Sequence, residues 1–202
     1  VVGPYIAIFT EWLGNLININ VDKHPFIGGI VISVSMGMFL TLPISSAAIG
    51  IMLGLSGLAS GAATIGCCCQ MVGFAVMSFK ENKVGGLISQ GIGTSMLQMP
   101  NIIRHPQIWI PPILSSAILA PVSTMVFKMV SNPVGSGMGT SGLVGQFSAY
   151  AVMVEAGTHP ATAVIQIMAM HFILPALVTY VIAYGMRKVG WIKDGYMKLE
   201  VQ

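Results

Sequence analysis

The sequence predicts an all-α integral membrane protein, and its composition, its long uncharged runs and its loop charges support this prediction. Of its 202 residues, 54% are hydrophobic and only 7% are charged. A soluble domain carries about a quarter charged residues, because its surface faces water. Lipid accepts apolar side chains on the outside of a protein, so a bilayer is the expected surroundings. The net charge of +3 is too small and too scattered for nucleic-acid binding, and no nucleic-acid partner is expected.

Charged residues divide the chain into apolar runs that are long enough to cross a bilayer. A crossing helix needs about 20 apolar residues, and residues 24–79 contain no Asp, Glu, Lys or Arg. This run must fold back at least once, and Leu42-Pro43 is the natural break, because proline disfavours helix at the residue before it. We expect about five transmembrane helices. Their expected ranges are 1–20, 25–42, 57–79, 105–127 and 160–186.

Two segments are too polar for lipid-facing helices. Residues 84–103 and 132–154 include stretches rich in glycine, hydroxyl and amide groups. Irregular polar backbone at membrane depth is tolerated only where protein or a water-filled cavity covers it. Both segments are therefore expected to be re-entrant or broken helices, and the stretch 43–56 is a candidate for a third.

The loop charges predict an orientation. With 25–42 directed outward and 57–79 inward, nearly all basic residues fall on the cytoplasmic side, as the positive-inside rule requires. The residues expected there are Lys23, Lys80, Lys83, Arg104, Arg187, Lys188, Lys193 and Lys198, and Lys128 is expected outside.

Residues 1–202 are expected to form a single transmembrane transport domain. The sequence opens with neither an initiator methionine nor a charged leader. We therefore expect it to be the C-terminal part of a longer chain.

Polar side chains near the irregular segments predict a path for a neutral polar solute. Amides and hydroxyls offer donors and acceptors without net charge, which suits a polyol. The predicted lining residues are Thr94, Gln98, Asn101, Thr140, Ser141 and Gln146. Glu155 or Glu11 would serve as an acidic anchor, since a lone carboxylate at membrane depth usually faces a cavity or a partner. The alternatives are an interfacial loop for Glu155 and a shallower first run for Glu11.

Several other patterns indicate packing. Residues 137–142 satisfy G-x-G-x-x-G, but the dinucleotide motif needs a preceding strand and an acidic residue about 20 positions later. Close helix packing or a solute-lining loop explains this segment better. Gly50-x-x-x-Gly54 and Gly57-x-x-x-Gly61 predict helix contact. His171 is expected to hydrogen-bond to a neighbouring helix.

The adjacent residues Cys67, Cys68 and Cys69 lack metal-ligand spacing, so they are expected to pack as small apolar side chains. No Ser-His-Asp, Walker or metal-binding pattern occurs in the sequence. We therefore predict no catalytic residue, no metal site and no cofactor.

Three stretches carry a resemblance to a known family. They read LPISSAAIG (42–50), GLSGLASGAATIGCCCQMVGFAVMSFKENKVGGLISQGIGTSMLQMPNIIRHPQIWIPP (54–112) and GMGTSGLVGQ (137–146). As whole strings they resemble the membrane subunit (enzyme IIC, EIIC) of bacterial phosphotransferase-system (PTS) sugar transporters, in a compact branch of that group.

The resemblance implies a homodimer in the bacterial inner membrane that takes up a sugar or polyol. A phosphorylated cytoplasmic partner subunit then modifies the sugar, so the chain is a component of a sugar phosphotransferase complex without a nucleophile of its own. The partner would dock on cytoplasmic loops, for which Lys80, Lys83 and the basic tail are candidates. Better-studied carriers bind sugar through a glutamate and a histidine on re-entrant segments. Those motifs do not align letter by letter here, so Glu155 and His105 remain open as their counterparts.

Three functions are compatible with the sequence. The first is a sugar-translocating PTS subunit. The second is an ion- or proton-coupled transporter of another polar solute, in which Glu11, Glu155 and His171 would titrate. The third is a membrane sensor that does not transport, in which the glycines serve packing alone.

Overall fold

Three long helices form the frame of the fold. The computed structural model describes residues 3–199, and the side chains from residue 8 onward. All named elements in this part are helical, as the sequence predicts. Three of its helices are long and apolar enough to cross a membrane: α4 (Gly57–Met77), the continuous stretch Pro106–Phe127 and the continuous stretch Pro160–Lys188. They coincide closely with three of the five expected runs.

The second stretch contains η3 (Pro106–Trp109), α7 (Ile110–Pro121) and η4 (Val122–Phe127). The third contains α10 (Pro160–Ile167), η6 (Met168–Ile173) and α11 (Leu174–Lys188).

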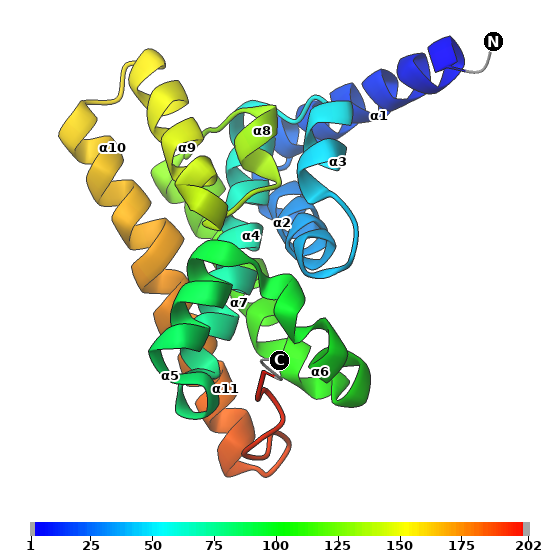
Figure 1. Ribbon diagram of the computed structural model, residues 1–202. Coiled ribbons are helices and arrows are strands. Elements are labelled where there is room, and N and C mark those ends of the chain that lie inside the picture. Colours follow the sequence, from blue (N-terminus) through cyan, green and yellow to red (C-terminus); the bar gives the residue numbers. More distant parts are fainter. Residues whose placement is uncertain (1–2, 200–202) are drawn as a thin grey trace.

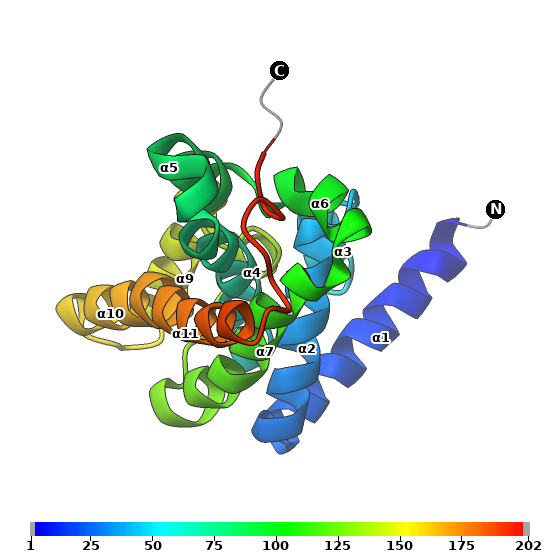
Figure 2. The same ribbon diagram turned by 90° about the horizontal axis from the view of Figure 1, so that it is seen from below.

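The other two expected runs are helical as well, as α1 (Gly3–Lys23) and α2 (Pro25–Thr41). At 17 residues, α2 is apolar but shorter than the three long helices. Helix α1 projects away from the rest of the molecule toward the N-terminus (Figures 1 and 2).

Helix α4 is the central element, and α2, α7 and α11 pack around it (Figure 2). In its most apolar window, 94% of the residues are buried. Its small residues allow this, because a Cβ at Gly66 would overlap the backbone of Ser33, and one at Gly61 would overlap the backbone of Met129.

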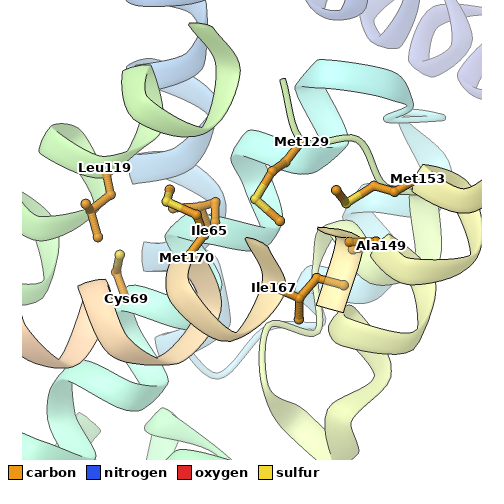
Figure 3. Packing of buried hydrophobic residues seen from close by; sticks show 9 residues of the cluster. Ile65, Cys69, Leu119, Met129, Ala149, Met153, Ile167 and Met170 are labelled. Carbon is orange, nitrogen blue, oxygen red and sulfur yellow. The ribbon is translucent and has the colours of Figure 1, made fainter. Parts of the chain in front are cut away.

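One core cluster lies between α4, α7 and the C-terminal helices. Figure 3 shows Ile65 and Cys69 of α4 in this cluster together with Leu119, Ile167 and Met170. All three cysteines are free and buried, in agreement with the packing role predicted for them.

Contacts along α4 give the directions of its neighbours. Gly61 meets Met129, whereas the Ser115 hydroxyl lies 3.6 Å from the sulfur of Cys69, so α7 and η4 run antiparallel to α4. Thr179 of α11 meets Gly73, and Arg187 donates to the carbonyl of Met77, so α11 runs parallel to α4.

The molecule therefore has two ends. We call the end where α4 and α11 finish the basic end, since it holds Lys80, Lys83, Arg187, Lys188 and Lys193. The other is called the opposite end.

Three broken helical hairpins fill the space beside these helices. The first hairpin joins α2 to α3 (Ser46–Met52) through the expected break at Leu42-Pro43, where Leu42 has extended backbone with φ −70° and ψ 156°. The second is built from α5 (Phe79–Ile88), η1 (Ser89–Gly93), η2 (Ser95–Gln98) and α6 (Met99–Arg104). The third is built from α8 (Pro133–Ser136), η5 (Ser141–Leu143) and α9 (Val144–Glu155).

The expected direction of residues 25–42 is wrong. Thr124 donates to the carbonyl of Pro25 at 2.9 Å, and Ser33 donates to the carbonyl of Ser116 at 3.2 Å. Helix α2 therefore runs antiparallel to α7 and parallel to α4. Lys23, which immediately precedes it, lies at the opposite end, as Lys128 does, and not at the basic end. The physical reason is that the chain turns back at Leu42-Pro43, so α2 and α3 form a hairpin in place of a helix followed by a short loop.

Candidate functional site

The tips of the three hairpins meet beside the middle of α4. The Thr41 hydroxyl, at the end of α2, lies 2.9 Å from the Ser95 hydroxyl in the second hairpin. Thr41 also donates to Oε1 of Gln70 on α4 at 3.2 Å, and Nε1 of Trp109 donates to the same oxygen at 2.9 Å. In the third hairpin, Thr140 donates to the carbonyl of Gly91 in the second. We call the residues Thr41, Gln70, Ser95, Trp109 and Thr140 the tip junction.

The third hairpin approaches this point from the opposite end. Ser60 donates to the carbonyl of Asn132 at 2.6 Å, Thr64 donates to that of Gly135 at 3.2 Å, and the Thr140 hydroxyl lies 3.5 Å from the sulfur of Met71. The chain therefore follows α4 from residue 60 to residue 71. Helix α9 then returns, with Ala149 packed in the same cluster as Ile65.

The second hairpin approaches from the basic end. The Gln90 side-chain nitrogen donates to the Ser78 hydroxyl at 3.0 Å, and a Cβ at Gly91 would touch the Ala75 side chain. Ser95 lies at the level of Gln70, because Thr41 contacts both residues.

Local sequence explains why both tips are irregular. Thr94 follows the π-helix η1, and its extended backbone (φ −160°, ψ 142°) redirects the chain. The Thr94 hydroxyl accepts a hydrogen bond from the amide of Met96. In the third hairpin, Gly139 has φ +53° and sits directly against the backbone of Cys67. Only glycine combines this backbone conformation with so close an approach.

The tip junction is buried, neutral and incompletely hydrogen-bonded. Thr41, Gln70, Ser95 and Thr140 are fully buried. The Gln70 side-chain nitrogen Nε2 has no hydrogen-bond partner within the described residues. Leaving such a donor unpaired costs about 1–3 kcal/mol, so an unpaired amide in a native core calls for an explanation. A solute hydroxyl oxygen could accept from this nitrogen.

The predicted lining residues occupy three places. Thr140 belongs to the tip junction, and Thr94 and Ser141 lie half-buried at the two tips. Gln98 and Asn101 lie nearer the basic end, in a buried amide ladder. There Gln98 donates to Gln90 at 2.8 Å, and Asn101 donates to Gln98 at 2.9 Å.

The C-terminal tail closes this ladder. Gln98 also donates to the carbonyl of Met197, and Asn101 donates to that of Lys198, each at 3.0 Å. The ladder amides are thus occupied by the chain itself.

Gln146 occupies the third place. Its Nε2 lies 3.0 Å from Nδ1 of His171 and 3.6 Å from the sulfur of Cys68. Cys68 and Gln70 are two residues apart on α4, which turns them about 200° from each other. Gln146 therefore lies on the other side of α4 from Gln70, and His171 makes the interhelical hydrogen bond expected of it.

Both predicted acidic anchors lie elsewhere. Glu155 is exposed at the end of α9, roughly 16 Å along that helix from its start at the tip. Glu11 is exposed on α1. The structure brings neither carboxylate to the tip junction.

Sequence reasoning missed Thr41, Ser95 and Trp109. A partial signal existed for Thr41, because the Leu42-Pro43 break places it at a helix end. The roles of Ser95 and Trp109 depend on tertiary contacts with α2 and α4. In the described part of the chain, no group of three or more His, Cys, Asp or Glu side chains could hold a metal ion.

Comparison with known proteins gives one result. The sequence model of the family described as "Phosphotransferase system, EIIC" matches residues 1–199. No curated protein and no solved structure matches the chain.

Proposed function

The chain belongs to the phosphotransferase-system EIIC family, and from this premise we propose that it translocates a sugar or polyol that binds at the tip junction. The observation that carries the proposal is the meeting of the three hairpin tips at a buried, neutral and polar junction, where Nε2 of Gln70 is unpaired. Hydroxyl groups, an amide and the Trp109 ring offer hydrogen bonds and an apolar face without net charge, as a neutral polyol requires.

The arrangement of the hairpins supports translocation. We infer that α4, residues 106–127 and residues 160–188 cross the membrane, and that the hairpins re-enter it. A solute site between broken helices near the bilayer midplane is typical of transporters, because each side can open to it in turn. The second hairpin would gate the site from the basic end, and the third would gate it from the opposite end.

The charges support a cytoplasmic location for the basic end, following the positive-inside rule. A phosphorylated partner subunit would act on the sugar there, and the membrane would be the bacterial inner membrane. This chain would supply binding and passage and no nucleophile. The homodimer implied by the family resemblance stays a prediction.

The two rival functions have less support. The ion- or proton-coupled transporter would require titration of Glu11, Glu155 and His171, and none of these residues lies at the tip junction. A sensor in which the glycines serve packing alone would give no reason for three hairpin tips to meet at a buried polar junction.

A matched pair of substitutions tests the site. Gln70→Met removes the amide at the tip junction with little change in volume, and Gln146→Met does the same on the other side of α4. Thermal-shift titration with a panel of sugars and polyols reports binding, since a ligand raises the melting temperature with dose. We expect one sugar to stabilise the unmodified protein and Gln146→Met, but not Gln70→Met.

Trp109→Phe is a milder second variant. It removes one of the two donors that hold Oε1 of Gln70 in place, and we expect it to weaken binding less than Gln70→Met does. Equal responses of Gln70→Met and Gln146→Met would refute the proposed position of the site. If no sugar shifted the unmodified protein, the sensor function would be favoured. Uptake into vesicles that needs no phosphorylated partner would contradict the coupling.

A further inference from the structure

A cavity of about 930 Å³ lies between α5, the end of α4 and the end of α11, on the flank of the basic end and outside the tip junction. One part of its wall is apolar and aromatic, including Phe79, Leu87, Tyr180 and Tyr184. The other part is basic. Its charged residues are Lys80, Lys83, Arg187, Lys188, Lys193 and Asp194.

Two of these basic residues are neutralised by carboxylates of the chain. Arg187 pairs with Glu81 at 2.9 Å and with Asp194 at 2.6 Å, and Lys80 pairs with Asp194 at 2.6 Å.

The other three lysines leave the cavity positively charged. Lys83, Lys188 and Lys193 are exposed and form no ion pair within the described part of the chain. Lys188 lies over the Tyr184 ring, with its Nζ 4.9 Å from the ring centroid. The carboxylates beside the cavity do not neutralise these three lysines, so the cavity attracts an anion.

The apolar wall identifies the kind of anion. Along α11, Leu177, Tyr180, Val181 and Tyr184 are exposed, and their face continues from the cavity toward the middle of the helix. In a membrane protein, an exposed apolar helix face contacts lipid chains. Tyr180 and Tyr184 are stacked, with ring centroids 6.3 Å apart, and aromatic side chains gather at the headgroup level of a bilayer.

We propose that this cavity binds the headgroup of one anionic phospholipid. Its phosphate contacts Lys83, Lys188 and Lys193, and its acyl chains follow the exposed face of α11. Basic pockets beside transmembrane helices bind anionic lipid headgroups in this way. An anion held between Lys83 and Lys188 ties α5 to α11. Lys83 is the residue where α5 is kinked, with φ +54°, so the lipid supports the start of the second hairpin.

The test uses two double variants with the same change in charge. Lys83→Gln/Lys188→Gln removes two cavity lysines. Lys23→Gln/Lys128→Gln removes two exposed lysines from the opposite end. The purified chain in detergent is titrated with phosphatidylglycerol, phosphatidylcholine or inorganic phosphate, and its melting temperature is followed.

Phosphatidylglycerol is expected to stabilise the unmodified protein and the Lys23→Gln/Lys128→Gln control, whereas the other two additives have no effect. The apparent affinity of Lys83→Gln/Lys188→Gln for phosphatidylglycerol is expected to fall about 25-fold, at about fivefold for each lysine. All four lysines are exposed, so both variants should fold.

Three results would overturn the proposal. An equal loss in the two double variants would show a diffuse charge effect. Stabilisation by inorganic phosphate alone would assign the cavity to a free anion. No response to phosphatidylglycerol, together with partner-dependent sugar phosphorylation lost only in Lys83→Gln/Lys188→Gln, would assign the lysines to the partner subunit.

Discussion

Glu81→Gln should destabilise the protein by about 2 kcal/mol, because it removes the charge that neutralises a half-buried arginine. The Glu81 side chain is 6% exposed and that of Arg187 is 18% exposed, and Glu81 Oε1 also accepts from the amide of Gly195. Removing one partner of a buried ion pair costs about 3–5 kcal/mol, and a hydrogen bond to a charged group is worth about 1.5–3 kcal/mol. Arg187 keeps its bond to Asp194, so the lower part of the range for a hydrogen bond to a charged group applies.

The matched control is Lys80→Gln, which breaks an ion pair of similar length whose side chains are 70% and 64% exposed. Exposed pairs contribute about 0–1 kcal/mol, so this variant should change stability little. Thermal unfolding in detergent measures both variants. For a chain of this size, a loss of 2 kcal/mol corresponds to a fall of about 4–8 °C in melting temperature. Equal effects of the two substitutions would refute the argument that burial makes the Glu81 pair strong.

Two further predictions concern close packing and acid sensitivity. Gly66→Ala should lower the melting temperature by several degrees, because the added Cβ overlaps the backbone of Ser33, whereas Gly185→Ala, with no atom within 4 Å, should be neutral or slightly stabilising. The hydrogen bond from Lys80 and the nearby positive charges lower the pKa of Asp194 from its ordinary value of 3.8. A lowered pKa gives stability that is present above the ordinary value and is lost as pH falls through the folded-state value. Melting curves from pH 6 to pH 3 should therefore fall less for Asp194→Asn than for the unmodified protein, and parallel curves would contradict this assignment.

Much of the fold follows from the spacing of charges. The uncharged runs gave the long helices, and glycine-rich composition located the breaks in the second and third hairpins. Hydropathy could not show that α2 turns back, because an apolar run that crosses and one that re-enters have the same composition. Lys23 was therefore assigned to the wrong end, since charge counting assumed that successive runs alternate.

The candidate site was predictable in residue type but not in grouping. Hydroxyl and amide residues near the breaks do reach buried positions, as Thr140 and Gln98 show. Thr140 and Gln146 belong to the same hairpin, yet Thr140 reaches Gly91 and Gln146 reaches Cys68, and neighbours in sequence do not determine that. Glu11 was expected beside a cavity or a partner because it is a lone carboxylate in an apolar run, yet it is exposed on α1, which projects from the body of the molecule (Figure 1).

The two Gly-x-x-x-Gly patterns, at residues 50–54 and 57–61, predicted helix contact correctly for only one glycine each. Gly50 and Gly61 make the close approaches expected of them, against Ser136 and Met129. Gly54 and Gly57 instead have positive φ and no atom within 4 Å of an added Cβ. They shape the turn between α3 and α4, so a four-residue glycine spacing alone did not distinguish packing from turning.

The enclosure of α4 has a consequence for biosynthesis. Its buried polar residues Ser60 and Thr64 donate to carbonyls of the third hairpin, and Gln70 accepts from Trp109, all of which are made later. When α4 leaves the ribosome, lipid would meet those groups directly, and hydrocarbon cannot satisfy them. The nascent helix therefore needs the insertion machinery or α2 as temporary cover until the third hairpin has been added. Truncated chains that end before the third hairpin should consequently be substrates for membrane quality control.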